Sequence, residues 1–115
     1  MREIWDHHDN LLREVPDRPL RWSLDSIKAE AHELSEADHK DDPEGFLHEG
    51  ADVVLSYMSA MKAAGFSYEV AMQAVMEKLN IVIDRAIRAN LMPSDMPWQQ
   101  RYETVKAEEI VVFGE

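Results

Sequence analysis

Two pairs of acidic residues are the part of this sequence best suited to metal binding or catalysis. Glu30 and Glu33 share one segment, and Glu49 and Asp52 repeat their spacing further along the chain. Residues three positions apart project from one face of an α-helix. Four converging carboxylates repel one another unless a hard divalent cation such as Mg²⁺ or Mn²⁺ binds them. The pattern predicts a divalent metal site, and solvated acidic helix faces are the alternative.

The acidic pairs fall in two helices that the sequence predicts as antiparallel neighbours. Ser23 is expected to be the N-cap of a helix over 24–40, which has an apolar stripe at helical spacing. Asp42 as N-cap and Pro43 at the first helical position predict a second helix over 43–64, which ends at Gly65. The short connection between the helices should bring the four carboxylates together.

The remaining segments are also predicted to be mostly helical. We expect a helix over 1–15, a proline-containing linker over 16–19 and a helix over 68–90. The tail from Trp98 should begin with a short helix and end in a β-like run over 110–113. With only four glycines and five prolines, the sequence predicts an all-α fold, with a helical domain over 1–97 and a tail over 98–115.

Residues 51–61 are apolar nearly all round their predicted helix. A helix of this kind has to be buried on several sides. One short helical hairpin offers too little surface to cover it. The sequence therefore predicts a helical bundle whose core is shared across a homo-oligomer, either a dimer or a tetramer.

Composition narrows the classes of function. The 115 residues include 23 acidic and 12 basic side chains, a net charge of −11, which disfavours direct binding to a nucleic-acid polymer. The absence of cysteine excludes disulfides, thiolate metal sites and cysteine nucleophiles. No apolar run approaches the roughly 20 residues of a membrane span, so we expect no membrane partner and a cytoplasmic location. Phosphate-binding glycine loops and serine nucleophile motifs are missing, so an enzyme here has to be metal-based.

Two sequence motifs resemble those of a known family. Residues 28–37, Lys-Ala-Glu-Ala-His-Glu-Leu-Ser-Glu-Ala, resemble the first motif of the MazG-like all-α nucleoside triphosphate pyrophosphohydrolases, E-E-x-x-E followed by leucine and a further acid. Glu49-Gly50-Ala51-Asp52-Val53 is similar to the second motif, E-x-x-D followed by valine. Gly65 and Lys78 fall where the family has a turn glycine and a lysine. The resemblance covers about 24–85 and implies a helical bundle of the MazG-like type.

The resemblance implies hydrolysis of a nucleoside triphosphate, either ribo- or deoxyribo-, to the monophosphate and pyrophosphate. The metal ligands would be Glu30, Glu33, Glu49 and Asp52, with Mg²⁺ as cofactor and Mn²⁺ as a substitute. Glu30 or Glu33 would be the catalytic base. Ala29 stands where the family commonly has its first glutamate, so the number of metals and the identity of the base stay open.

Candidates for binding the rest of the substrate lie outside the motifs. Lys78 and Arg85 are about two turns apart on one predicted helix face and could hold a polyphosphate, with surface charges or ion pairs to Glu77 or Asp84 as the alternative. Trp22 and His7 could stack on a nucleobase. Packing is the alternative for Trp22 and Trp5, and a solvated surface is the alternative for His7 and His8.

Three alternative interpretations of the sequence stay open. A ferritin-like di-iron bundle is suggested by the Glu-x-x-His pair Glu36 and His39, although that fold requires two such pairs. A non-catalytic regulatory or scaffolding module is favoured by Ala29 and by Val82, where the family has an amide. Phosphoribosyl-ATP is an alternative substrate for a pyrophosphohydrolase.

Overall fold

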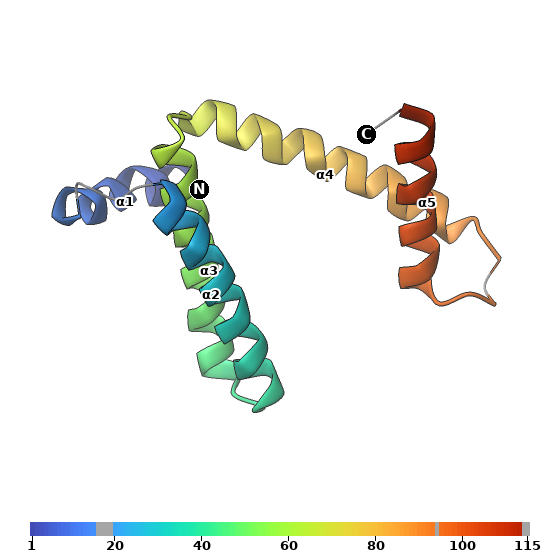
Figure 1. Cartoon of the computed structure of the whole chain (residues 1–115), viewed down its shortest axis with the longest axis horizontal. Helices are drawn as coiled ribbons and strands as arrows, with labels where there is room; N and C mark the ends of the chain where they lie inside the picture. The colour runs from blue at the N-terminus through green and yellow to red at the C-terminus, as the bar shows by residue number, and fades with distance from the viewer. Residues whose placement is uncertain (16–19, 94, 114–115) are drawn as a thin grey trace. The chain divides into compact units, whose positions relative to one another are not determined.

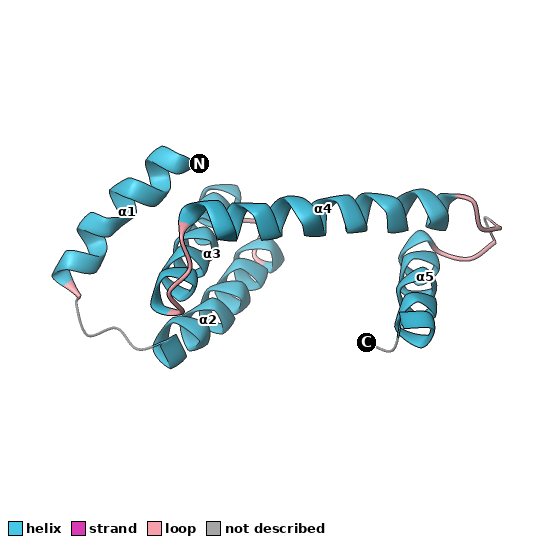
Figure 2. Ribbon diagram, turned by 90° about the horizontal axis from the view of Figure 1, so that it is seen from above, coloured by secondary structure: helices cyan, strands magenta, loops and turns pink. Residues whose placement is uncertain are grey.

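The computed structural model of the chain describes residues 1–15, 20–93 and 95–113, with the side chains of His39 and of residues 110–113 left aside. Every regular element within these ranges is an α-helix, which confirms the predicted all-α class (Figure 2). The helices are α1 (Arg2–Glu14), α2 (Leu20–His39), α3 (Pro43–Ala63), α4 (Tyr68–Asn90) and α5 (Trp98–Phe113). None of them is long and apolar enough to cross a membrane. The predicted linker over 16–19 lies outside the described residues.

Helices α2 and α3 form an antiparallel hairpin, in which they run side by side (Figure 1). Asp41 closes α2 with a φ of 55°, a left-handed conformation that aspartate tolerates better than most residues. The Asp42 amide then donates to the Ala37 carbonyl at 3.0 Å, which completes a Schellman-type C-cap. The Asp42 carboxylate accepts from the Gly45 amide at 3.0 Å and Pro43 follows as the first residue of α3, so the predicted start of this helix is confirmed.

The prediction that Ser23 caps α2 was wrong. The helix begins at Leu20, and Ser23 lies inside it with its side chain fully buried. An ion pair between Arg21 and Asp25, 2.8 Å apart at i,i+4 spacing, supports the additional turn. Ser23 therefore packs against the neighbouring elements, while the N-terminus of the helix lies further upstream.

Helix α1 docks on α3 through a polar cluster built around Lys62. The Lys62 ammonium donates to the Trp5 carbonyl at 2.6 Å, to His8 Nδ1 at 3.1 Å and to Asp9 at 2.7 Å, so each of its three protons has an acceptor on α1. His8 Nε2 lies 3.0 Å from Ser59 Oγ. The hydrogen bond from Lys62 lowers the pKa of Asp9. His8 is buried, so the expected solvated surface was wrong for this residue, whereas packing of Trp5 is confirmed.

The chain divides into two compact units, 1–71 and 72–115. The first unit contains α1, α2, α3 and the beginning of α4. In the second unit, Trp98 Nε1 donates to Asn90 at 2.7 Å, and its ring stacks on Tyr102 at 5.5 Å between centroids. The predicted domain over 1–97 with a separate tail stays a prediction.

The C-terminal segment is helical to Phe113, so the expected β-like run over 110–113 was wrong. The Val-Ile composition of this run favours a strand only weakly, because packing overrides such preferences. Just before it, Glu109 accepts from Arg85 at 2.6 Å and also pairs with Arg88. These contacts tie the turn of α5 that directly precedes the run to α4.

Candidate metal centre

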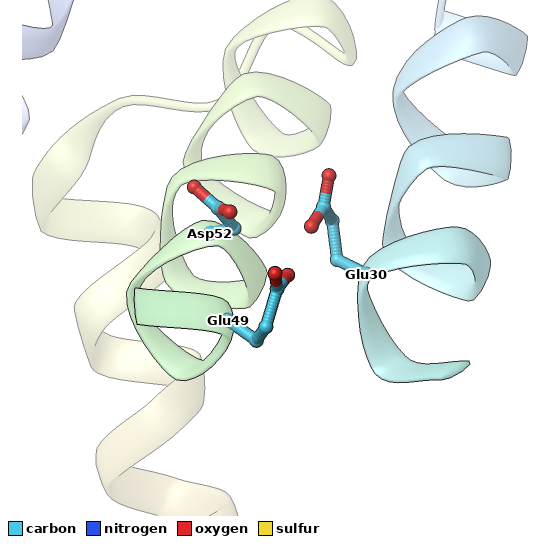
Figure 3. A group of neighbouring side chains, drawn as sticks. All are labelled: Glu30, Glu49 and Asp52. Atoms are coloured by element: carbon cyan, nitrogen blue, oxygen red, sulfur yellow. The ribbon is translucent and has the colours of Figure 1, made fainter. Parts of the chain in front are cut away.

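Three carboxylates converge between α2 and α3 (Figure 3). Glu30 reaches in from α2, while Glu49 and Asp52 stand one turn apart on α3. One oxygen from each of the three lies within 4.8 Å of the others. The antiparallel hairpin therefore brings together three of the four ligands predicted from the sequence, one from the first acidic pair and both from the second.

Two oxygens of this cluster have no hydrogen-bond partner. Glu30 and Glu49 are half-buried, and Oε2 of each is shut off from solvent without accepting a hydrogen bond. A carboxylate oxygen in this position carries a desolvation penalty that nothing on the protein offsets. A divalent cation would compensate both oxygens at once, and an all-oxygen donor set suits Mg²⁺ or Mn²⁺. The residues present thus fit the predicted metal.

Glu33, the fourth predicted ligand, lies beside this group on the exposed side of α2. Burial raises the pKa of Glu30 to about 7, and hydrogen bonding to Glu33 adds to this rise. Hydrogen bonding to Glu33 is also the main cause that raises the pKa of Glu49. Without a cation, Glu30 therefore keeps its proton to a higher pH than an ordinary glutamate does.

A cavity of about 330 Å³ adjoins the cluster at the turn end of the hairpin. Its lining includes two members of the acidic group, Glu33 and Glu49, and one basic residue, Lys40. Lys40 was not predicted to belong to the site. The signal was present in the sequence, because Glu33, Glu36 and Ala37 share one face of α2 and the spacing puts Lys40, directly after the helix, on the same side, where its amide donates to the Glu36 carbonyl at 3.0 Å.

The residues predicted to bind phosphate lie in the second compact unit. Lys78 is exposed on α4. Arg85 is mostly buried and pairs with Glu109, rather than with Glu77 or Asp84, and this bond raises the pKa of Arg85. Asp84 pairs with Arg88 at 3.0 Å. A role for Lys78 and Arg85 in holding phosphate stays a prediction.

The two residues proposed to contact the base occupy different helices. Trp22 lies on α2 and is 45% exposed, so a fully packed position is not observed. His7 is exposed on α1, within 3.1 Å of the Asn10 amide nitrogen. It borders a mainly apolar cavity of about 480 Å³ whose lining includes Ile4 and Leu55. Base binding by Trp22 and His7 stays a prediction.

The second Glu-x-x-His pair that a ferritin-like site requires does not occur in the sequence. In the one pair present, Glu36 lies 3.8 Å from His32, while the His39 side chain lies outside the described part of the structure. Comparison with protein-family models, with curated proteins and with solved structures finds no match to this chain.

Proposed function

We propose that this protein is a metal-dependent nucleoside triphosphate pyrophosphohydrolase of the MazG-like type. The convergence of one oxygen each from Glu30, Glu49 and Asp52 within 4.8 Å is the observation that carries the proposal, and it is supported by a buried Oε2 atom without a hydrogen-bond partner on Glu30 and on Glu49. The two motifs that contain these residues supply the reaction class by resemblance. A cytoplasmic location, where nucleotides and Mg²⁺ occur together, is part of the proposal.

The reaction consumes one water and gives a nucleoside monophosphate and pyrophosphate. The water oxygen forms a bond to the α phosphorus. The bond from this phosphorus to the oxygen that bridges the α and β phosphates breaks, and pyrophosphate leaves with the electron pair. Mg²⁺, when bound, neutralises the phosphate oxygens and increases the acidity of the water. Glu30, Glu49 and Asp52 would hold the cation and fix its position. Glu33 or Glu30 accepts the proton that the water loses.

A triphosphate can bind to this acidic protein only if a metal centre reverses the local negative charge. The chain carries a net charge of −11, and the carboxylates of the cluster concentrate part of this negative charge where an anionic substrate would bind. Carboxylates that hold divalent cations present a reversed local charge to the substrate. Catalysis of phosphoryl transfer consists mainly of positioning and charge neutralisation, which this set of groups provides.

We also propose that the protein acts as a homo-oligomer, a dimer or tetramer. Met76, Leu79, Ile83 and Ile87 recur along one face of α4, and each is about half exposed in the single chain. A row of large apolar side chains on one helix face is typical of a surface that packs against another helix. Light scattering of the intact protein measures the number of copies.

The products of the reaction test the proposed function. Incubation of the intact protein with a panel of nucleoside triphosphates and Mg²⁺, followed by ion-exchange chromatography, should give monophosphate and pyrophosphate. A chelator should abolish the conversion. If diphosphate and orthophosphate are the first products, the protein belongs to a different reaction class.

Lack of turnover with every common nucleotide would also contradict this proposal. A protein that still binds Mn²⁺ but hydrolyses nothing would match the non-catalytic module, which the alanine at position 29 favours. If phosphoribosyl-ATP is the one substrate that is hydrolysed, the proposed reaction class stands and the proposed substrate is wrong.

A further inference from the structure

We propose that the cavity at the turn end of the α2–α3 hairpin binds the pyrophosphate portion of the substrate, and that Lys40 is its cationic ligand. The inference rests on the proposed function and adds the orientation of the substrate to it. The cavity has a volume of about 330 Å³ and is lined by Glu33, Glu36, Ala37, Lys40, Asp42, Gly45 and Glu49. All of these residues belong to the first compact unit.

The cavity adjoins the proposed metal centre at Glu49. This residue contributes an oxygen to the converging carboxylates and also lines the cavity. Its Oε2 atom is buried without a hydrogen-bond partner. Phosphate oxygens bridged to the carboxylates by divalent cations would thus lie next to the cavity, and the remainder of the polyphosphate could enter it.

The charge of the lining suits phosphate with its cations better than a nucleobase. Five of the seven lining residues are ionisable, four of them acidic and one a lysine, so phosphate enters only with its divalent cations, whereas base faces stack on aromatic or apolar surfaces. Lys40 is the one positively charged residue among those described around the cavity. Its ammonium group is a compact donor of three hydrogen bonds, which phosphate oxygens accept readily.

Two residues of the lining are small. Gly45 and Ala37 contribute no bulky side chain, and a Cβ atom at Gly45 would clash with the Asp42 carboxylate. The Asp42 carboxylate is itself engaged, because it accepts from the Gly45 amide at 3.0 Å. Gly45 also lies in the first turn of α3, where the helix dipole adds partial positive charge. Lys40 and the helix terminus therefore counter part of the negative charge of the four lining carboxylates, and divalent cations that enter with the pyrophosphate counter the rest.

This arrangement defines the orientation of the substrate relative to the turn between α2 and α3. Pyrophosphate gains negative charge as the bond to the α phosphate breaks, and a nearby ammonium stabilises that charge. The leaving group points toward the turn between α2 and α3, and the nucleoside points away from it. Lys40 contacts the phosphates directly in this account, so its removal weakens pyrophosphate binding more than monophosphate binding.

The test is calorimetric binding of inorganic pyrophosphate to the intact protein in the presence of Mg²⁺. We expect Lys40→Ala to raise the Kd for pyrophosphate about tenfold, which corresponds to the loss of one charge-assisted hydrogen bond. Lys40→Arg should restore most of the affinity. The Kd for nucleoside monophosphate should change less than twofold in the same variants.

Lys28→Ala is the matched control. Lys28 is, like Lys40, an exposed lysine, but it lies within α2 two residues from Glu30 and therefore faces away from the cluster. This variant should bind pyrophosphate as the wild type does. An unchanged Kd in Lys40→Ala, an equal loss in Lys28→Ala or no pyrophosphate binding by the wild type would each overturn the inference.

The outcomes separate this inference from the proposed function. If the wild type hydrolyses triphosphates and Lys40→Ala binds pyrophosphate normally, the function stands and the role of Lys40 fails. If pyrophosphate binds in a Lys40-dependent manner but no nucleotide is hydrolysed, the anion site stands and the proposed reaction fails.

Discussion

Glu49→Gln and Asp52→Asn are each expected to lower turnover of the triphosphate by about 10²–10³-fold. Each substitution removes one negative charge and keeps the shape of the side chain, so it weakens the bond to the cation without changing the packing of α3. Turnover is measured at saturating Mg²⁺ and substrate. The helical circular-dichroism signal should remain that of the wild type.

Glu44→Gln provides the matched control for these two variants. Glu44 lies on the same helix and is exposed, but it belongs neither to the converging carboxylates nor to the adjoining cavity. Its turnover should stay within twofold of the wild type. Full activity in both Glu49→Gln and Asp52→Asn would show that the cluster is not part of the catalytic site.

Stability of the metal-free protein should fall as the pH rises from about 4.5 to about 7. The pKa of Glu30 is raised from an ordinary value of 4.5 to about 7, chiefly by burial. Within that window the folded state binds more protons than the unfolded state, so the free energy of unfolding decreases with increasing pH. Thermal unfolding in the presence of a chelator at pH 5.5 and pH 8 measures this decrease.

Mg²⁺ should reverse this loss, because it binds the deprotonated cluster in the folded state only. A cation at about one hundred times its Kd adds roughly 2.7 kcal/mol, which raises the midpoint of a domain of this size by about 10 °C. We expect a shift of this order at pH 8 and a much smaller one at pH 5.5.

Glu30→Gln tests which group causes the pH dependence. This variant carries no titrating carboxyl at position 30, so the metal-free midpoint should change less between pH 5.5 and pH 8 than it does in the wild type, and the change that remains comes from Glu49, whose pKa is also raised. The shift produced by Mg²⁺ should also shrink. An Mg²⁺-induced shift of equal size at both pH values, unchanged in Glu30→Gln, would show that the cation acts elsewhere.

Local signals in the sequence were sufficient to predict most of the helix boundaries. Asp42, Pro43 and Gly65 act through the backbone of their own turns, and the predicted limits of α4 agree with the structure. The same signals led to the acidic cluster, because i,i+3 spacing and a short connection fix the geometry of a helical hairpin.

Long-range contacts explain where prediction failed. The burial of His8 depends on Lys62 and Ser59, which are distant in sequence and meet it only in the folded chain. Similarly, the pairing of Arg85 with Glu109 requires α5 to pack on α4. Neither contact has a periodic signature within its own segment. The difference in burial between Glu30 and Glu33 likewise follows from how α3 packs on α2.

Equilibrium binding of Mn²⁺ tests the central claim most directly, which is that the carboxylates of α2 and α3 hold a divalent cation. Electron paramagnetic resonance detects free Mn²⁺ and therefore gives the bound fraction at pH 8. We expect saturable binding by the wild type and by Glu44→Gln, with binding lost in the double variant Glu49→Gln/Asp52→Asn. Binding of equal strength and stoichiometry in the double variant and the wild type would contradict it.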